Sequence, residues 1–164
     1  MIPLVDLRMQ YQTMKHEVMA AIEGVLEDMQ LFLGPQAQAF EREFAAYCEC
    51  QHGVGLSNGT DALMLALRAC DIGPGDEVIT VANTFIATVE AIALVGATPV
   101  FVDCDPTTYT LDCWQLESAI TSRTRAILPV HLYGHPVDMQ SVLECAKAHG
   151  LRVIEDASQA HGAT

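Results

Sequence analysis

The sequence predicts an α/β fold, with a largely parallel sheet and helices on both faces. After residue 50, short apolar segments alternate with helical segments of about 10–15 residues, which is the pattern of parallel strands joined by crossover helices. The short segments are apolar at almost every position, as strands covered on both faces are. With 51% hydrophobic and 18% charged residues in 164, the chain has the composition of one globular domain.

The first 50 residues are expected to form a helical segment without strands. Residues 12–29 are predicted to be an amphipathic helix, because apolar side chains recur there at helical spacing: Val18, Ile22, Val25, Leu26 and Met29. Gly34 and Pro35 break this pattern, and proline is well suited to the first turn of a second helix. That helix places Phe40, Phe44 and Tyr47 on one side.

Residues 51–164 are expected to form the α/β domain. Strands are predicted at residues 53–57, 77–81, 99–102, 126–130 and 151–155. Helices are predicted between them at residues 60–70, 84–95, 114–120 and 139–149. The glycine- and proline-containing runs at 73–76 and 96–99 are turns. Each strand therefore leads, through a short junction, into a helix.

Charge and composition exclude several classes of partner. The formal net charge is −13 and the eight Lys and Arg residues are scattered, so no nucleic-acid partner is expected. The apolar runs are too short to span a membrane, and the N-terminus lacks a signal-peptide pattern, so a cytoplasmic protein is expected. The six cysteines are interpreted as reduced and structural.

Ser57-Asn58-Gly59-Thr60 joins a predicted strand to a predicted helix. Free backbone N–H groups and the helix dipole at such a junction favour an anion, and Thr60 adds a hydroxyl donor, which suits a phosphate monoester. The simpler interpretation is a helix N-cap, for which serine, asparagine and threonine are favoured anyway. Neither a Walker loop nor a Gly-x-Gly-x-x-Gly dinucleotide loop is present.

Two further strand ends carry candidate ligand-binding side chains. Phe85 lies where its ring would cover a planar cofactor, although a core phenylalanine is the simpler interpretation. Asp156 follows the last predicted strand, where it would pair with a pyridine nitrogen or serve as a solvated turn residue, and Gln159 would contact a ring hydroxyl. His131 also ends a strand, but glycine and proline around His135 disfavour a metal pair, so no metal site is expected.

Five motifs together resemble the DegT/DnrJ/StrS family of sugar aminotransferases. In chain order they are Ser-Asn-Gly-Thr-Asp-Ala-Leu, Gly-Pro-Gly-Asp-Glu-Val-Ile, Asn-Thr-Phe-Ile-Ala-Thr, Pro-Val-His-Leu-Tyr-Gly and Ile-Glu-Asp-Ala-Ser-Gln-Ala-His-Gly. The resemblance implies an incomplete large domain of a fold-type I transferase that uses pyridoxal 5'-phosphate (PLP). It implies a homodimeric enzyme when full length, with an amino-acid donor, usually glutamate, and a nucleotide-linked keto sugar as acceptor.

Site residues follow from the resemblance motif by motif. Gly59 and Thr60 would hold the phosphate, Phe85 would stack on the ring, Asp156 would pair with the pyridine nitrogen and Gln159 would contact the ring hydroxyl. The Schiff-base lysine of the family is expected beyond residue 164, so no catalytic residue is assigned within this chain. Two alternatives stay open: a PLP-dependent sugar dehydratase of the same family, and a catalytically incompetent cofactor-binding fragment.

Overall fold

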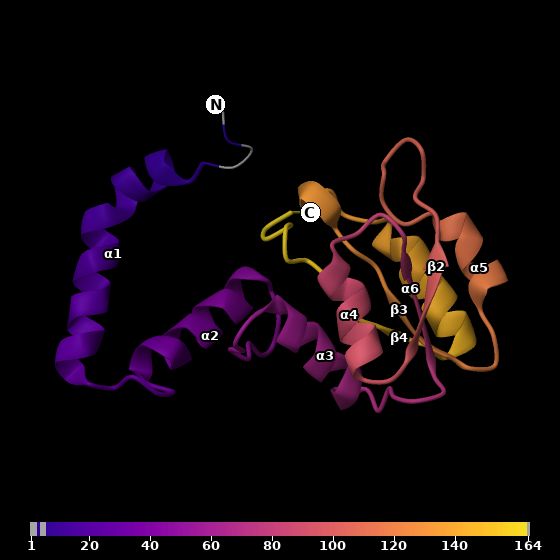
Figure 1. Cartoon of the computed structure of the whole chain (residues 1–164), viewed down its shortest axis with the longest axis horizontal. Coiled ribbons are helices and arrows are strands. Elements are labelled where there is room, and N and C mark those ends of the chain that lie inside the picture. Colours follow the sequence, from indigo (N-terminus) through magenta and orange to yellow (C-terminus); the bar gives the residue numbers. More distant parts are fainter. Residues whose placement is uncertain (1–2, 4–5, 164) are drawn as a thin grey trace. The chain divides into compact units, whose positions relative to one another are not determined.

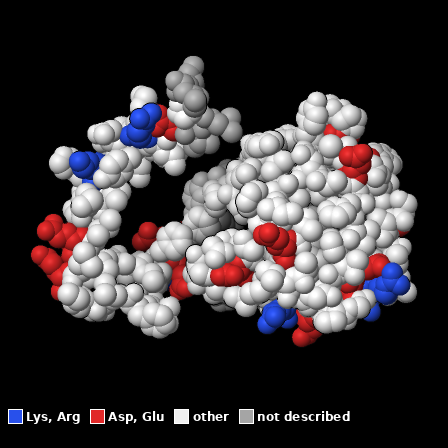
Figure 2. Space-filling view, in the orientation of Figure 1, with Lys and Arg blue, Asp and Glu red and all other residues white. Residues whose placement is uncertain are grey.

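The structure, a computed structural model, describes residue 3 and residues 6–163. The chain divides into two compact units, Met1–Gly55 and Leu56–Thr164 (Figure 1). The first unit is helical and the second contains the sheet. On the face shown in Figure 2, acidic side chains are spread over both units and the Lys and Arg side chains form no continuous patch.

The first unit contains two helices, α1 (Arg8–Asp28) and α2 (Pro35–Tyr47). Helix α1 begins four residues before the predicted start at residue 12 and ends where Met29 takes a left-handed conformation (φ 51°). Proline occupies the first turn of α2, as predicted, and the rings of Phe40 and Phe44 stack with centroids 5.4 Å apart. Among the described residues of this unit only Ala45 is buried, so it has almost no core of its own.

The prediction of a strand at residues 53–57 is wrong. The segment pairs with none of the described strands, and its valine, Val54, is 76% exposed. Instead the backbone lies against α2: the Gly55 N–H donates to Glu41 Oε1 at 2.8 Å, and a Cβ on Gly53 would lie 2.4 Å from the Glu41 carbonyl oxygen. The alternation of glycines and apolar residues in this segment is typical of a strand, but a strand also needs a neighbouring strand to which its backbone can hydrogen-bond.

The second unit is built on a four-stranded parallel sheet, which confirms the predicted fold class. The strands are β1 (Glu77–Val81), β2 (Thr98–Val102), β3 (Thr124–Leu128) and β4 (Arg152–Val153), in the order β2-β1-β3-β4. Every residue of β1 is buried, and the Thr80 hydroxyl donates to the Leu128 carbonyl oxygen at 2.9 Å, so this fully buried polar side chain has a partner.

Two details of the sheet differ from expectation. Strand β2 is an edge strand on which only Val102 is buried and Phe101 is half-exposed, so apolar composition did not mean coverage on both faces. Strand β4 is two residues long instead of the predicted five, but an isolated parallel bridge between Val130 and Asp156 continues its pairing with the segment after β3. That bridge brings Asp156 to the carboxyl end of the sheet.

Helices connect the strands as predicted. They are α3 (Gly59–Ala69), α4 (Ile86–Leu94), α5 (Leu116–Ala119) and α6 (Met139–His149), with short 3₁₀ turns at Cys113–Gln115 and Leu132–Gly134. Helix α6 matches its predicted bounds because Asp138 caps its first turn and Gly150 ends it in a left-handed conformation (φ 68°). None of the described helices is both long and apolar enough to cross a membrane.

The order of the strands creates a crevice at one edge of the sheet. The connection from β1 leads outward to β2, whereas β3 leads in the opposite direction to β4. With right-handed crossovers, α4 therefore covers one face and α6 the other. Ligands of open parallel sheets bind at the carboxyl ends of the strands where the chain direction reverses, here between β1 and β3.

Candidate functional site

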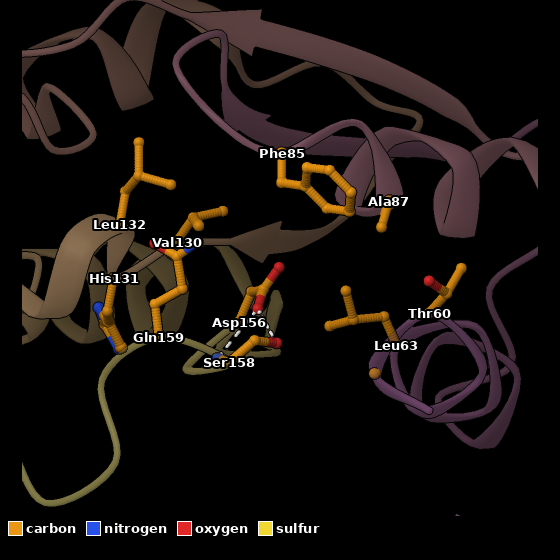
Figure 3. A pocket seen from close by; sticks show the side chains of 11 residues that line it. Thr60, Leu63, Phe85, Ala87, Val130, His131, Leu132, Asp156, Ser158 and Gln159 are labelled. Atoms are coloured by element: carbon orange, nitrogen blue, oxygen red, sulfur yellow. Dashed lines mark hydrogen bonds between the residues drawn. The ribbon is translucent and has the colours of Figure 1, made fainter. Parts of the chain in front are cut away.

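A cavity of about 210 Å³ lies at this reversal point, within the second unit (Figure 3). Its walls come from the start of α3, the junctions after β1 and β3, and the segment after β4, and its lining residues are Gly59, Thr60, Leu63, Phe85, Ala87, Val130, His131, Leu132, Asp156, Ser158 and Gln159. All five site residues predicted from the sequence are among them. Segments separated by about a hundred residues therefore meet in one place, as the strand-end argument requires.

Asp156 is the buried acidic group of this cavity, with 8% of its surface exposed. Its Oδ1 accepts hydrogen bonds from the Ser158 hydroxyl at 2.7 Å and from the Ser158 N–H at 3.2 Å. Its backbone is held on both sides, because the Asp156 N–H donates to Pro129 O at 2.9 Å and the His131 N–H donates to Asp156 O at 3.0 Å. The alternative of a solvated turn residue is therefore wrong.

The other carboxylate oxygen of Asp156 is held by a pair of threonines on α4 and the residues before it. The buried Thr88 hydroxyl lies 2.9 Å from Asp156 Oδ2, and the Thr84 hydroxyl lies 2.9 Å from that of Thr88. This two-hydroxyl chain links the junction after β1 to the end of β4. Burial of a carboxylate requires such partners, and here three donors orient it towards the cavity.

Helix α3 presents its N-terminus to the cavity. Asn58 is its N-cap, with the side-chain oxygen accepting from the Asp61 N–H at 2.9 Å, so the simpler capping interpretation is correct. Capping leaves the N–H groups of Gly59 and Thr60, which precede the first intrahelical bonds, directed out of the helix end. A Cβ on Gly59 would lie 3.4 Å from the Ser158 hydroxyl oxygen, so the glycine keeps this wall of the cavity open.

Phe85 is 66% exposed and caps the start of α4, so the core interpretation of this residue is wrong. Figure 3 shows its ring on one side of the cavity, across from Asp156 and Ser158, with Thr60 and Leu63 on α3 at one end. An exposed aromatic face beside a buried carboxylate is a suitable surface for a flat, partly charged ring.

Gln159 is fixed by a backbone donor. Its side-chain oxygen Oε1 accepts from the Tyr133 N–H at 2.7 Å, and Tyr133 itself has a left-handed conformation (φ 56°). Because the amide oxygen is engaged, the amide nitrogen of Gln159 is the group available as a donor. This orientation suits an acceptor such as an ionised ring hydroxyl.

His131 also lines the cavity, as its position at a strand end suggested. Its Nδ1 accepts from the Val137 N–H at 3.1 Å, which places the ring proton on Nε2, 3.1 Å from Glu155 Oε2. The hydrogen bond from His131 holds the pKa of Glu155 below its ordinary value, although burial raises it. Thr88 and Ser158 were not predicted as site residues. Ser158 lies two residues after Asp156, where an aspartate commonly accepts a bond from the chain that follows it, so a local signal existed for Ser158 but not for Thr88, which is 68 residues away.

Comparison with known proteins decides the family. A family model described as the DegT/DnrJ/EryC1/StrS aminotransferase family matches residues 12–164. The chain belongs to this family. It is 54% identical to a UDP-N-acetyl-3-dehydro-alpha-D-glucosamine 3-aminotransferase of Acidithiobacillus ferrooxidans, over 99% of the chain and 44% of that protein. It is 53% identical to a dTDP-3-amino-3,4,6-trideoxy-alpha-D-glucose transaminase of Streptomyces venezuelae, over 99% of the chain and 43% of that protein.

Solved structures give the same result for the fold. The chain superposes on S. venezuelae DesV in complex with a ketimine intermediate with a TM-score of 0.96 and 53% identity, covering 98% of the chain and 43% of DesV. On Bacillus subtilis NtdA with bound pyridoxamine phosphate (PMP), the TM-score is 0.95 at 37% identity, covering 99% of the chain and 38% of NtdA. The chain thus corresponds to the N-terminal part of these aminotransferases and spans less than half their length.

Proposed function

We propose that the chain is the N-terminal part of a PLP-dependent aminotransferase that acts on a nucleotide-linked keto sugar, with glutamate as the amino donor. The observation that carries this proposal is the buried, triply hydrogen-bonded Asp156 at the reversal point of the sheet, facing an exposed aromatic ring and a helix N-terminus. The UDP- and dTDP-sugar aminotransferases among its relatives support the substrate class and favour aminotransferase over dehydratase chemistry.

The residues of the cavity fit PLP. The Asp156 carboxylate would hold a proton on the pyridine nitrogen, and Phe85 would cover one face of the ring. The N–H groups of Gly59 and Thr60, with the Thr60 hydroxyl, would bind the phosphate at the positive end of the α3 dipole. The Gln159 amide nitrogen would donate to the ring hydroxyl oxygen. When bound, PLP would act as an electron sink: its ring would accept electron density from the carbon of the amino substrate at which a bond is broken.

Residues behind the cavity would keep these groups in place. The Thr84–Thr88 pair fixes Asp156 Oδ2, and the Tyr133 N–H fixes the amide of Gln159. When reacting groups are already held in the right orientation, less entropy is lost on reaching the transition state. In well-oriented systems this lowers the reaction barrier by up to roughly 7–11 kcal/mol. The cavity therefore supplies positioning and charge, and the proton-transferring amine has to come from elsewhere.

Neither lysine of the chain belongs to the segments that line the cavity. Lys15 belongs to α1 in the first unit, and Lys147 lies in the last turn of α6. Because α6 runs from the carboxyl end of β3 back to the start of β4, its last turn lies at the opposite edge of the sheet from Asp156. We therefore propose that the catalytic lysine belongs to a segment outside this sequence.

The assembly and location of the enzyme are part of the same proposal: a cytoplasmic homodimer. Helix α1 supports the dimer, because it carries exposed apolar side chains and buries no residue. Its exposed apolar side chains include Met9, Tyr11, Met14, Met19, Ile22 and Leu26. A helix of this kind is covered by another surface in most proteins.

Two measurements on the purified chain test the proposal. Titration with PLP should show reversible binding. Borohydride reduction followed by peptide mass mapping should show no stoichiometric adduct at Lys15 or Lys147, and no amino transfer should be detected. Absence of any PLP binding would contradict the cofactor assignment. A single stoichiometric lysine adduct with transfer to a keto sugar nucleotide would contradict the assignment of the lysine to another segment.

A further inference from the structure

Three side chains of types that bind metals meet on the surface formed by α5 and α6. Cys145 and His149 are four residues apart on α6 and therefore lie on the same face of the helix, and Glu117 reaches them from α5. One ligand atom from each, sulfur, nitrogen and oxygen, lies within 4.8 Å of the other two. No role in the proposed reaction requires any of them.

The spacing is close to that of a tetrahedral zinc site. Zinc binds nitrogen and oxygen at about 2.0 Å and sulfur at about 2.3 Å, so its ligand atoms lie roughly 3.3–3.5 Å apart. His149 Nε2 and Glu117 Oε2 are 2.8 Å apart and would separate slightly, while the Cys145 sulfur, which lies within 4.8 Å of both, would move towards them. The Glu117 side chain is 66% exposed and that of His149 35%, so rotamer changes suffice.

The surroundings of the cluster favour a cation. A shallow hollow beside the cluster is bordered by two further carboxylates, Asp138 and Glu144. A hydrogen bond joins His149 to Glu117, and Cys145, which packs partly buried against the core, adds a thiol within 4.8 Å of both ligand atoms.

We propose that Glu117, Cys145 and His149 form a binding site for a zinc-type divalent cation, with water in the fourth position. The site lies towards the amino edge of the sheet, because α5 leads into β3 and the last turn of α6 leads into β4. It is thus at the opposite edge from the Asp156 cavity, and it would connect two helices without taking part in catalysis. This proposal differs from the sequence-based expectation of no metal site.

Cobalt(II), which replaces zinc and absorbs light, is the probe. The purified chain with its thiols reduced should bind one equivalent and show a thiolate-to-cobalt charge-transfer band. Cys145→Ser should abolish the band, and the exposed substitutions His149→Gln and Glu117→Gln should each weaken binding by at least about tenfold. Affinity should rise with pH, since Cys145 must lose its proton to bind.

The matched control is a Cys48→Ser/Cys50→Ser double variant, which removes two exposed thiols of the first unit. It should keep the band and bind within about twofold of the parent chain. Circular dichroism checks that each variant is folded, and His149→Gln and Glu117→Gln keep the test valid if Cys145→Ser is unstable. A band that persists without Cys145, a band lost in the control, or no thiolate band in the parent chain would each overturn the proposal.

Discussion

Replacing Asp156 by asparagine should separate the charge of this residue from its structural role. Asparagine has the same shape, and its remaining side-chain oxygen can still accept both bonds from Ser158. Its NH₂ group would face the Thr88 hydroxyl, which can accept that bond and donate instead to Thr84, 2.9 Å away. Every buried group then keeps a partner, so the free energy of unfolding should change by no more than about 1 kcal/mol.

Cofactor binding should respond much more strongly. A hydrogen bond to a charged group contributes about 1.5–3 kcal/mol, and asparagine offers no negative charge to a protonated pyridine nitrogen. At 1.4 kcal/mol per factor of ten, the affinity should fall by about 10- to 100-fold. PMP is the ligand of choice, because its amine cannot form an imine with a surface lysine. Equilibrium dialysis gives the affinity and thermal unfolding gives the stability.

Asp103→Asn is the matched control, since Asp103 follows the outer strand β2, on the other side of the sheet from β4, and does not line the cavity. It removes one negative charge near the same edge of the sheet, and its remaining oxygen can still accept from the Cys104 N–H. Affinity for PMP should stay within about twofold of the parent chain. If Asp156→Asn also bound PMP within twofold, the assignment of Asp156 to the ring nitrogen would be refuted.

Three other predictions concern the support of the site, the core and a thiol. Thr88→Val should weaken PMP binding by about 5- to 10-fold whereas Thr88→Ser should not, because only serine keeps the hydroxyl near Asp156. Equal PMP affinities of the valine and serine variants would contradict the positioning role of Thr88. Leu67→Ala should cost about 2–5 kcal/mol in denaturant unfolding because Leu67 is fully buried, whereas Leu65→Ala, on the same helix but 41% exposed, should cost well under 1. Burial, with the charges of Asp138 and Asp112, raises the pKa of Cys113 from 9.0 to about 11, so the neutral thiol of Cys113 is favoured. Because the thiolate is the reactive form, alkylation of Cys113 at pH 8 should be up to roughly a hundredfold slower than alkylation of the exposed Cys48. The Cys113 rate should still be rising above pH 9, and similar rates at both cysteines would contradict this.

The sequence predicted correctly those elements whose two ends are set by capping residues close by in the chain. Helix α6 has its predicted bounds because Asp138 and Gly150 define its two ends through short-range contacts. The segment at 53–57 was predicted wrongly because pairing is a long-range property, and no described strand lies beside it. Apolar composition likewise does not distinguish the buried strand β1 from the edge strand β2.

The site was predictable in part for the same reason. Strand ends in a parallel sheet share one edge, so Phe85 and Asp156 could be assigned to one crevice before any coordinates. Thr88 could not, because its bond to Asp156 spans 68 residues and depends on the register of β1, β3 and β4. The cluster proposed above as a metal site could not be predicted from the sequence, because Glu117 joins Cys145 and His149 only once α5 packs against α6.

The central claim is that the Asp156 cavity is the cofactor site, and amide NMR during a PMP titration tests it most directly. The largest chemical-shift changes should occur at Gly59, Thr60, Phe85 and Gln159, and the amides of α5 and the last turn of α6 should stay unchanged. Shift changes centred on any other part of the chain, or none at PMP concentrations that saturate dialysis binding, would contradict the claim.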